Sequence, residues 1–159
     1  MTDNPTLDTA DSLFEQGKFD QANAIYEMID SHELENAASK LRIGEIALLS
    51  NNLEKAEDYL SRVLRINPDN NRAKSLLAES FIRRDMFDKA STMYFDLNRE
   101  GIATTLRHFQ DLTPYDISSE VSETSIDFVM KDPLPIVTLK VNEKERCDFL
   151  IDTGAASVI

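Results

Sequence analysis

Asp152 is the residue of this chain whose type and surroundings point most directly to chemistry. It is followed by Thr153 and Gly154 and preceded by the apolar run at 149–151. A carboxylate in such a loop can act as a general acid or base when its surroundings set its protonation state. The triplet therefore suggests a catalytic carboxylate. The other interpretation is a surface turn, in which Asp152 and Gly154 only supply turn geometry.

The first two thirds of the chain repeat with a period of 34 residues. Segments 16–22, 50–56 and 84–90 each place a polar turn before a small residue. Small residues recur at Ala10, Gly44 and Ala78 and again at Ala22, Ala56 and Ala90; large ones recur at Phe19, Leu53 and Phe87 and at Tyr26, Leu60 and Tyr94. Apolar residues at helical spacing predict two short amphipathic helices in each unit. Neither helix could bury its apolar stripe alone, so we expect the units to stack.

This pattern resembles the tetratricopeptide repeat (TPR) over about residues 3–101, and Pro68 lies where a helix of that family should end. The resemblance implies a mainly α fold, a three-repeat helix-turn-helix solenoid with repeats at about 3–34, 37–68 and 71–101. We expect Gly101 to end the last repeat helix in a left-handed conformation. A capping helix at 102–111, with Ile102, Leu106 and Phe109 on one face, would complete a solenoid over 3–111. Lys40 and Lys74 depart from the family, which often has a large aromatic residue there.

The TPR resemblance also implies a protein or peptide ligand, held in a groove lined by the first helix of each repeat. One groove position is acidic in all three repeats, at Asp11, Glu45 and Glu79. Three carboxylates would repel a peptide C-terminus, the ligand that some family members hold with Lys and Asn. Two interpretations remain open: solvated helix faces of an acidic protein, or a groove for a basic or N-terminal segment attracted by a negative field.

After residue 112 the sequence changes to short alternating patterns. Residues 112–131 predict a linker with a short strand, in which Ile126, Phe128 and Met130 share one side. Strands are expected at 136–141 and 146–151, joined by a turn at 142–145. Their shared faces are predicted to hold Val137, Leu139 and Val141 on the first strand and Cys147, Phe149 and Ile151 on the second. We expect Cys147 to be a half-buried apolar residue.

A retropepsin-like aspartic protease domain begins with a strand, a turn, a second strand and then Asp-Thr-Gly-Ala. Residues 132–159 show this order and so resemble the N-terminal fragment of such a domain. The resemblance implies peptide-bond hydrolysis by two carboxylates that share one proton. Asp152 would be one of them. The Thr153 hydroxyl would lock two active-site loops together, and Gly154 would let the backbone pass close to the carboxylates. No metal and no organic cofactor is implied.

The sequence contains no second Asp-Thr-Gly or Asp-Ser-Gly. We therefore expect the partner aspartate from a second subunit of a homodimer or from residues beyond 159, and we expect this chain alone to be inactive. It would be the TPR interaction module of a parent aspartic endopeptidase. The alternative is a non-enzymatic TPR scaffold or adaptor with a degenerate or coincidental tail. Because Val137, Leu139, Phe149 and Ile151 would form an uncovered face, the tail is expected to be disordered, packed on the repeats or paired with another chain.

Composition limits the classes of partner. With 29 acidic and 17 basic residues, the net charge is −12, which argues against nucleic acid, whose phosphates require clustered Lys and Arg. No apolar run approaches the length of a membrane span, and the N-terminus lacks the features of a signal peptide. The single cysteine cannot form an internal disulfide. These features predict a soluble cytoplasmic protein without a membrane partner.

Overall fold

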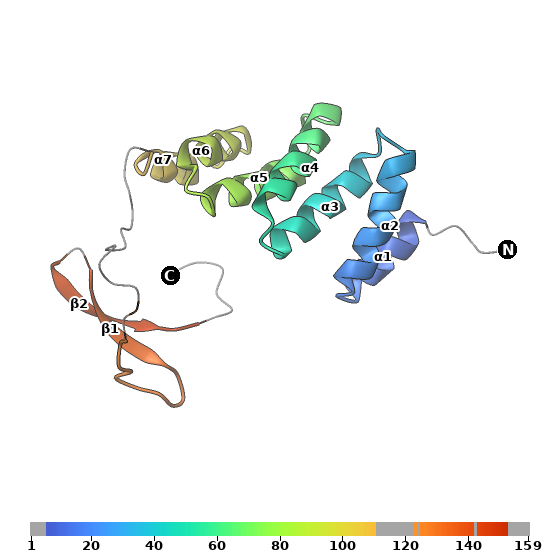
Figure 1. Cartoon of the computed structure of the whole chain (residues 1–159). Helices are drawn as coiled ribbons and strands as arrows, with labels where there is room; N and C mark the ends of the chain where they lie inside the picture. The colour runs from blue at the N-terminus through green and yellow to red at the C-terminus, as the bar shows by residue number, and fades with distance from the viewer. Residues whose placement is uncertain (1–5, 111–122, 124, 142, 153–159) are drawn as a thin grey trace. The chain divides into compact units, whose positions relative to one another are not determined.

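A computed structural model describes residues 6–110, 123, 125–141 and 143–152. Within these residues the chain forms seven α-helices followed by two β-strands (Figure 1). The helices are α1 Leu7–Glu15, α2 Phe19–His32, α3 Ala37–Leu49, α4 Leu53–Ile66, α5 Asn71–Ile82, α6 Phe87–Asp96 and α7 Glu100–Arg107; the strands are β1 Ile136–Val141 and β2 Glu145–Leu150. The chain divides into two compact units, Met1–Pro114 and Tyr115–Ile159, which are described separately below.

Helix boundaries follow from a few polar residues. Side chains of Thr6, Asn36, Asn52 and Asn70 accept a hydrogen bond from the backbone N–H three residues on, and so begin α1, α3, α4 and α5. Between the two helices of each repeat, one residue has a positive φ angle: Gly17, Asn51 and Asp85, again 34 residues apart. Gly, Asn and Asp are the residues that enter this left-handed region most readily. The sharp turn of each repeat therefore has its own periodic signal.

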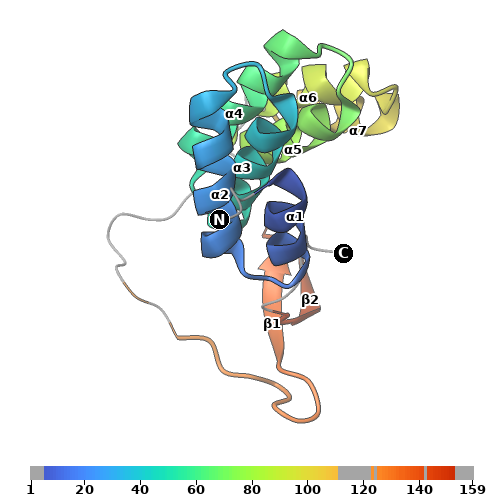
Figure 2. The ribbon, with the colours of Figure 1, turned by 90° about the vertical axis from the view of Figure 1, so that its right-hand side faces the viewer.

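Each helix packs against the next one along the chain, and the helices are stacked in sequence (Figures 1 and 2). All six of the small repeat positions are buried. At Gly44 of α3 the approach is close, since a Cβ atom there would lie 2.8 Å from Cγ of Leu60 on α4. The predicted close contact between the two helices of a repeat is thus observed.

The apolar core of the helical unit consists of two clusters that meet in α3. The first cluster contains Ala10, Ala22, Tyr26, Ile43 and Ile46, from α1, α2 and α3. The second is larger and extends from α3 to α7; its buried residues include Ala47, Leu48, Leu60, Val63, Leu77, Phe81 and Leu106. α3 contributes side chains to both clusters, so it connects the N-terminal helix pair to the rest of the unit.

The last helix differs from its prediction in one physical detail. Asn98, with φ 58°, takes the left-handed position after α6, whereas Gly101 lies inside α7. The prediction that Gly101 ends the last repeat helix was therefore wrong, because asparagine can also adopt that conformation. α7 covers α6 as a cap through buried Ala103 and Leu106, while Ile102 remains 43% exposed.

The second unit contains a two-stranded antiparallel hairpin. Its register pairs Val137 with Phe149 and Leu139 with Cys147, so the two predicted faces are one shared face. Val137 is buried and Phe149 is partly buried, so this face is less exposed than we expected. Cys147 is exposed, and the prediction of half-burial was wrong. A two-stranded sheet leaves a side chain near the turn open to solvent even on its apolar face.

Candidate functional site

The first of the three predicted groove acids, Asp11 of α1, joins two other helices. Its carboxylate accepts a hydrogen bond of 2.6 Å from the Tyr26 hydroxyl on α2 and one of 3.0 Å from Nε of Arg42 on α3. Burial and the hydrogen bond to Asp11 raise the pKa of Tyr26. Burial is the largest single influence on the pKa of Arg42 and would lower it, but Asp11, Tyr26 and Glu45 together outweigh burial, and that pKa is raised. Asp11 is therefore engaged in holding α1, α2 and α3 together.

The second acid, Glu45, is almost buried, with its side chain 10% exposed. One oxygen pairs with Nη1 of Arg42 at 3.3 Å, and the other accepts a short contact from Nη2 of Arg72 on α5. Arg42 thus bridges Asp11 and Glu45. The result is a chain of alternating charges, Asp11, Arg42, Glu45 and Arg72, that crosses α1, α3 and α5. We call this set the charge ladder.

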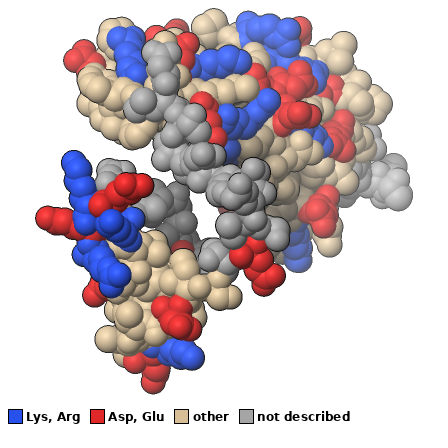
Figure 3. Space-filling view, turned by 60° about the vertical axis from the view of Figure 1, so that its left-hand side comes forward, with Lys and Arg blue, Asp and Glu red and all other residues tan. Residues whose placement is uncertain are grey.

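The third acid, Glu79, is separate from the charge ladder. It pairs with Arg83 one turn further along α5, and its side chain is 46% exposed. Arg83 also donates a hydrogen bond of 3.1 Å to the backbone oxygen of Leu48 on α3. All three predicted acids therefore have an arginine partner. On the face shown in Figure 3, acidic and basic side chains are interspersed over the helical unit.

Sequence reasoning missed the arginines of this surface, although part of the signal was present. Arg42 lies three residues before Glu45, and Arg83 lies four residues after Glu79, spacings that place side chains together on a helix. The pairing of Arg72 with Glu45 joins residues 27 positions apart in sequence. No local rule predicts that pair.

A second set of ion pairs involves glutamates of α2 and α4. Lys55 of α4 donates a 2.6 Å hydrogen bond to Glu27 of α2, which lowers the pKa of Glu27. Arg84 likewise reaches Glu57 of α4 at 2.6 Å. Beside this pair is an open hollow of about 550 Å³, lined by Glu54, Glu57, Asp58, Ser61, Arg65 and Arg84. Its lining has no apolar side chain, which is unlike the pockets that hold small organic ligands.

Asp152 lies in the second unit, two residues after the end of β2, and is exposed. Thr153 and Gly154 lie outside the described residues, so the geometry of the triplet is not described. Among the described residues, no group of three or more His, Cys, Asp or Glu side chains is arranged to hold a metal ion. None of the helices in the described parts of the chain has the length and apolar character needed to cross a membrane.

Comparison with known families gives a match within the helical unit. The tetratricopeptide repeat family matches residues 13–80, from within α1 into α5. Residues 13–80 are a TPR region. A TPR region indicates a protein–protein interaction module with protein partners in general. No curated protein matches the chain, and the comparisons give no support to an aspartic protease domain.

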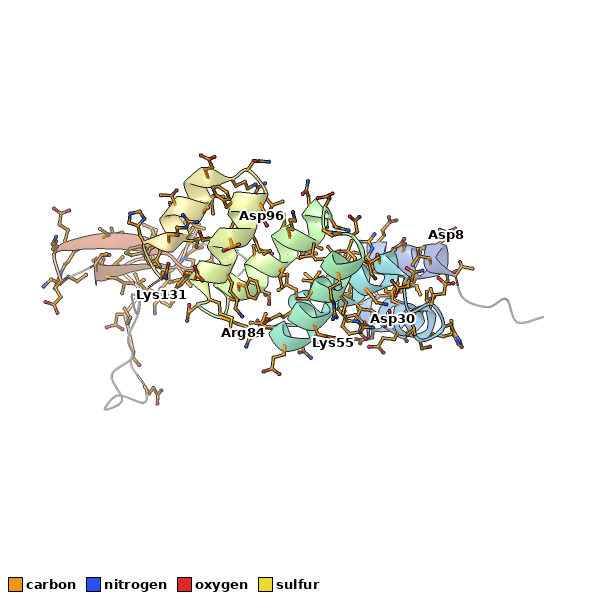
Figure 4. All side chains as sticks on the ribbon, turned by 90° about the horizontal axis from the view of Figure 1, so that it is seen from above. Asp8, Asp30, Lys55, Arg84, Asp96 and Lys131 are labelled. Atoms are coloured by element: carbon orange, nitrogen blue, oxygen red, sulfur yellow. The ribbon has the colours of Figure 1, made fainter. Side chains whose placement is uncertain are left out.

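Lys40 is a departure from the usual TPR pattern that the structure explains. Its ammonium group pairs with the carboxylate of Asp30 at the end of α2, and both side chains are buried, at 2% and 9% exposure. Arg62 of α4 approaches the other oxygen of Asp30 at 3.5 Å; Asp30 is labelled in Figure 4. A buried charge needs such a partner. Here a buried ion pair fills this position.

Proposed function

We propose that the TPR region binds an extended segment of a partner protein along the face formed by α1, α3 and α5. The observation that carries the proposal is the charge ladder, because it holds polar side chains of three successive first helices in fixed positions. A surface that is already ordered loses less conformational entropy when a ligand binds. Leu49, seven residues after Arg42 on α3 and 57% exposed, adds an apolar contact next to the ladder.

The favoured ligand is a basic or N-terminal segment with an apolar residue. Asp11 and Glu79 remain 36% and 46% exposed despite their arginine partners, and a carboxylate can accept several hydrogen bonds. The net charge of −12 would attract a basic segment over a longer range. Glu45 is a poor candidate for direct contact, because two guanidinium groups already hold its nearly buried oxygens.

A random peptide library displayed on phage, selected against the 159-residue chain, provides the test. Selected peptides should be rich in Lys or Arg, and their affinity should fall at least about tenfold in Leu49→Asp and in Glu79→Arg. Leu134→Asp and Glu123→Arg make the same changes at exposed positions of the second unit and should leave affinity unchanged. Equal loss in both sets, or affinity that does not vary with salt, would contradict the proposed face and ligand.

We also propose that residues 132–159 open a retropepsin-like aspartic protease domain of a longer parent protein. The observation in favour is that β1 and β2 form a hairpin whose second strand ends two residues before Asp152. Asp152 would share a proton with an aspartate of a second subunit, activate water and hydrolyse a peptide bond. Thr153 and Gly154 would support the loop, and no cofactor would be needed. The alternative proposal remains a non-enzymatic TPR scaffold.

Cleavage of quenched fluorescent peptides by the parent protein separates these proposals. An endopeptidase predicts cleavage that pepstatin inhibits and that Asp152→Asn abolishes, whereas Asp127→Asn, the same change at an exposed position outside the strands, retains it. If no peptide in a broad substrate library is cleaved between about pH 3 and pH 8, the scaffold proposal stands. Neither outcome affects the proposed peptide-binding face, which belongs to the other unit.

A further inference from the structure

The outer edge of β2 presents backbone groups that the hairpin does not use. The backbone N–H of Ile151 donates to Pro135 at 2.9 Å, so Ile151 bonds toward the first strand. Because bonding direction alternates along a strand, Phe149 and Cys147 also bond toward β1, and Arg146, Asp148 and Leu150 direct their N–H and C=O groups outward. Ile136 of β1 lies opposite Leu150, and its backbone N–H donates to Met130, away from β2. This agrees with Leu150 also directing its backbone groups away from the partner strand.

This edge is accessible within the described part of the chain. Arg146, Asp148 and Leu150 are exposed, and no hydrogen bond from their backbone groups to a described residue outside the hairpin is recorded. The described sheet contains only β1 and β2. An accessible edge strand is a template for another strand.

We propose that β2 pairs antiparallel with β2 of a second copy of this chain, about a twofold axis at Cys147. Charge complementarity supports this occupant and favours this register over those centred on the two neighbouring residues. With Cys147 opposite Cys147 of the second copy, Arg146 faces Asp148 of that copy, and the symmetry repeats the pair. A shift that centres the axis on Arg146 or on Asp148 places two like charges opposite each other, which destabilises a strand pair.

The backbone pattern agrees with the same register. Arg146 and Asp148 both bond outward, so together they form hydrogen-bonded pairs across the axis, and the two Cys147 residues form the non-hydrogen-bonded pair between them. Directly opposite residues of that type have Cα atoms about 4.5 Å apart, within the range that a disulfide spans. The Asp148 carboxylate is held by the Thr138 hydroxyl at 2.5 Å, which fixes it on the same face as Arg146. This inference depends neither on the peptide-binding face nor on the protease proposal.

Oxidation of the 159-residue chain with diamide tests the proposal. Two Cys147 thiols lose two protons and two electrons to diamide, and a covalent dimer is read by intact mass. We expect the dimer in the wild type and a yield at least about fivefold lower in Arg146→Asp and in Asp148→Arg, each of which places like charges opposite each other. The double variant exchanges the two charges and should restore the yield to within about twofold. Lys131→Asp, the same charge change outside the strands, should have no effect.

Equal cross-linking in all variants would mean random collision of exposed thiols and would overturn the proposal. A second measurement covers association without oxidation. In Cys147→Ser, the amide protons of Arg146, Asp148 and Leu150 should become protected from exchange as protein concentration rises toward about 1 mM, the range of a weak interface. Protection that is independent of concentration would mean that the chain's own residues cover the edge, and absence of protection would mean that no copy binds; either result overturns the proposal.

Discussion

Removal of the buried Asp30 carboxylate should be one of the most damaging single changes to the helical unit. In Asp30→Leu, the Lys40 ammonium group stays in a site where its side chain is 2% exposed, with no carboxylate beside it. Breaking a buried ion pair in this way costs about 3–5 kcal/mol. For a unit of this size we expect the unfolding midpoint to fall by more than about 10 °C.

The opposite deletion should cost less, because the structure gives Asp30 a second cation. In Lys40→Met, Arg62 remains 3.5 Å from Asp30, so we expect a loss of about 1–3 kcal/mol. Asp30→Leu combined with Lys40→Met removes both charges, and its stability should return to within about 1 kcal/mol of the wild type. The double-mutant cycle therefore measures the coupling of the pair directly.

Urea unfolding followed by circular dichroism at 222 nm gives these free energies. Lys74→Met is the matched control, because Lys74 occupies the equivalent position 34 residues later, is partly buried and has no recorded ion pair with a described residue. It should change stability by less than about 0.5 kcal/mol. The reasoning is refuted if Asp30→Leu costs under about 1 kcal/mol, or if the double variant is as unstable as Asp30→Leu.

Three further changes test the local arguments by the same unfolding measurement. Gly44→Ala should destabilise the unit by about 1–3 kcal/mol, because the new Cβ would clash with Leu60. Gly101→Ala is the control: no atom lies within 4 Å of its new Cβ, so it should be neutral or stabilising by up to about 1 kcal/mol. Equal effects of the two changes would contradict the close contact at Gly44. Asn51→Val should cost about 1–2 kcal/mol because φ is 56° there, and Asn51→Gly should not. For Glu27, the folded-state pKa lies below the ordinary value of 4.5, so its contribution is present above that pH and is lost as pH falls through the folded pKa. Glu27→Gln should therefore cost up to about 1 kcal/mol at pH 7 and nothing near pH 2; a cost that persists in acid would exclude the ionic origin.

The periodic part of the fold was accessible from sequence because a solenoid is built from local rules. Small residues such as Ala22 and Ala56 recur at the repeat period and lie where helices touch, and strand alternation located both faces of the hairpin. Gly101 misled the prediction because two residue types can take the left-handed conformation, and Asn98 takes it here. The turn was predicted one residue too long and the second strand one residue too late, because the structure begins β2 at Glu145 and pairs that residue with Val141.

The candidate surface was less accessible, because its contacts cross between repeats. The sequence predicted Asp11 and Glu45 as acidic groove positions, but the partner that joins them, Arg42, depends on how α1 packs against α3. Lys40 was visible only as a departure from a pattern. Its explanation required Asp30, which lies on a different helix and has no motif around it.

The division of the apolar core at α3 affects the order in which parts of the helical unit unfold. The N-terminal pair, α1 and α2, shares only a small apolar cluster with α3 and depends heavily on the ion pairs of Asp11 and Asp30. In a linear array, each repeat is held by its neighbour alone. We therefore expect α1 and α2 to open as one unit before the remaining helices, and at constant neutral pH their amide protons should exchange faster than those of α4 and α5, the more so as added salt screens the exposed ion pairs. The first repeat thus adheres through a small apolar cluster supplemented by ion pairs, while the later repeats share the larger apolar cluster.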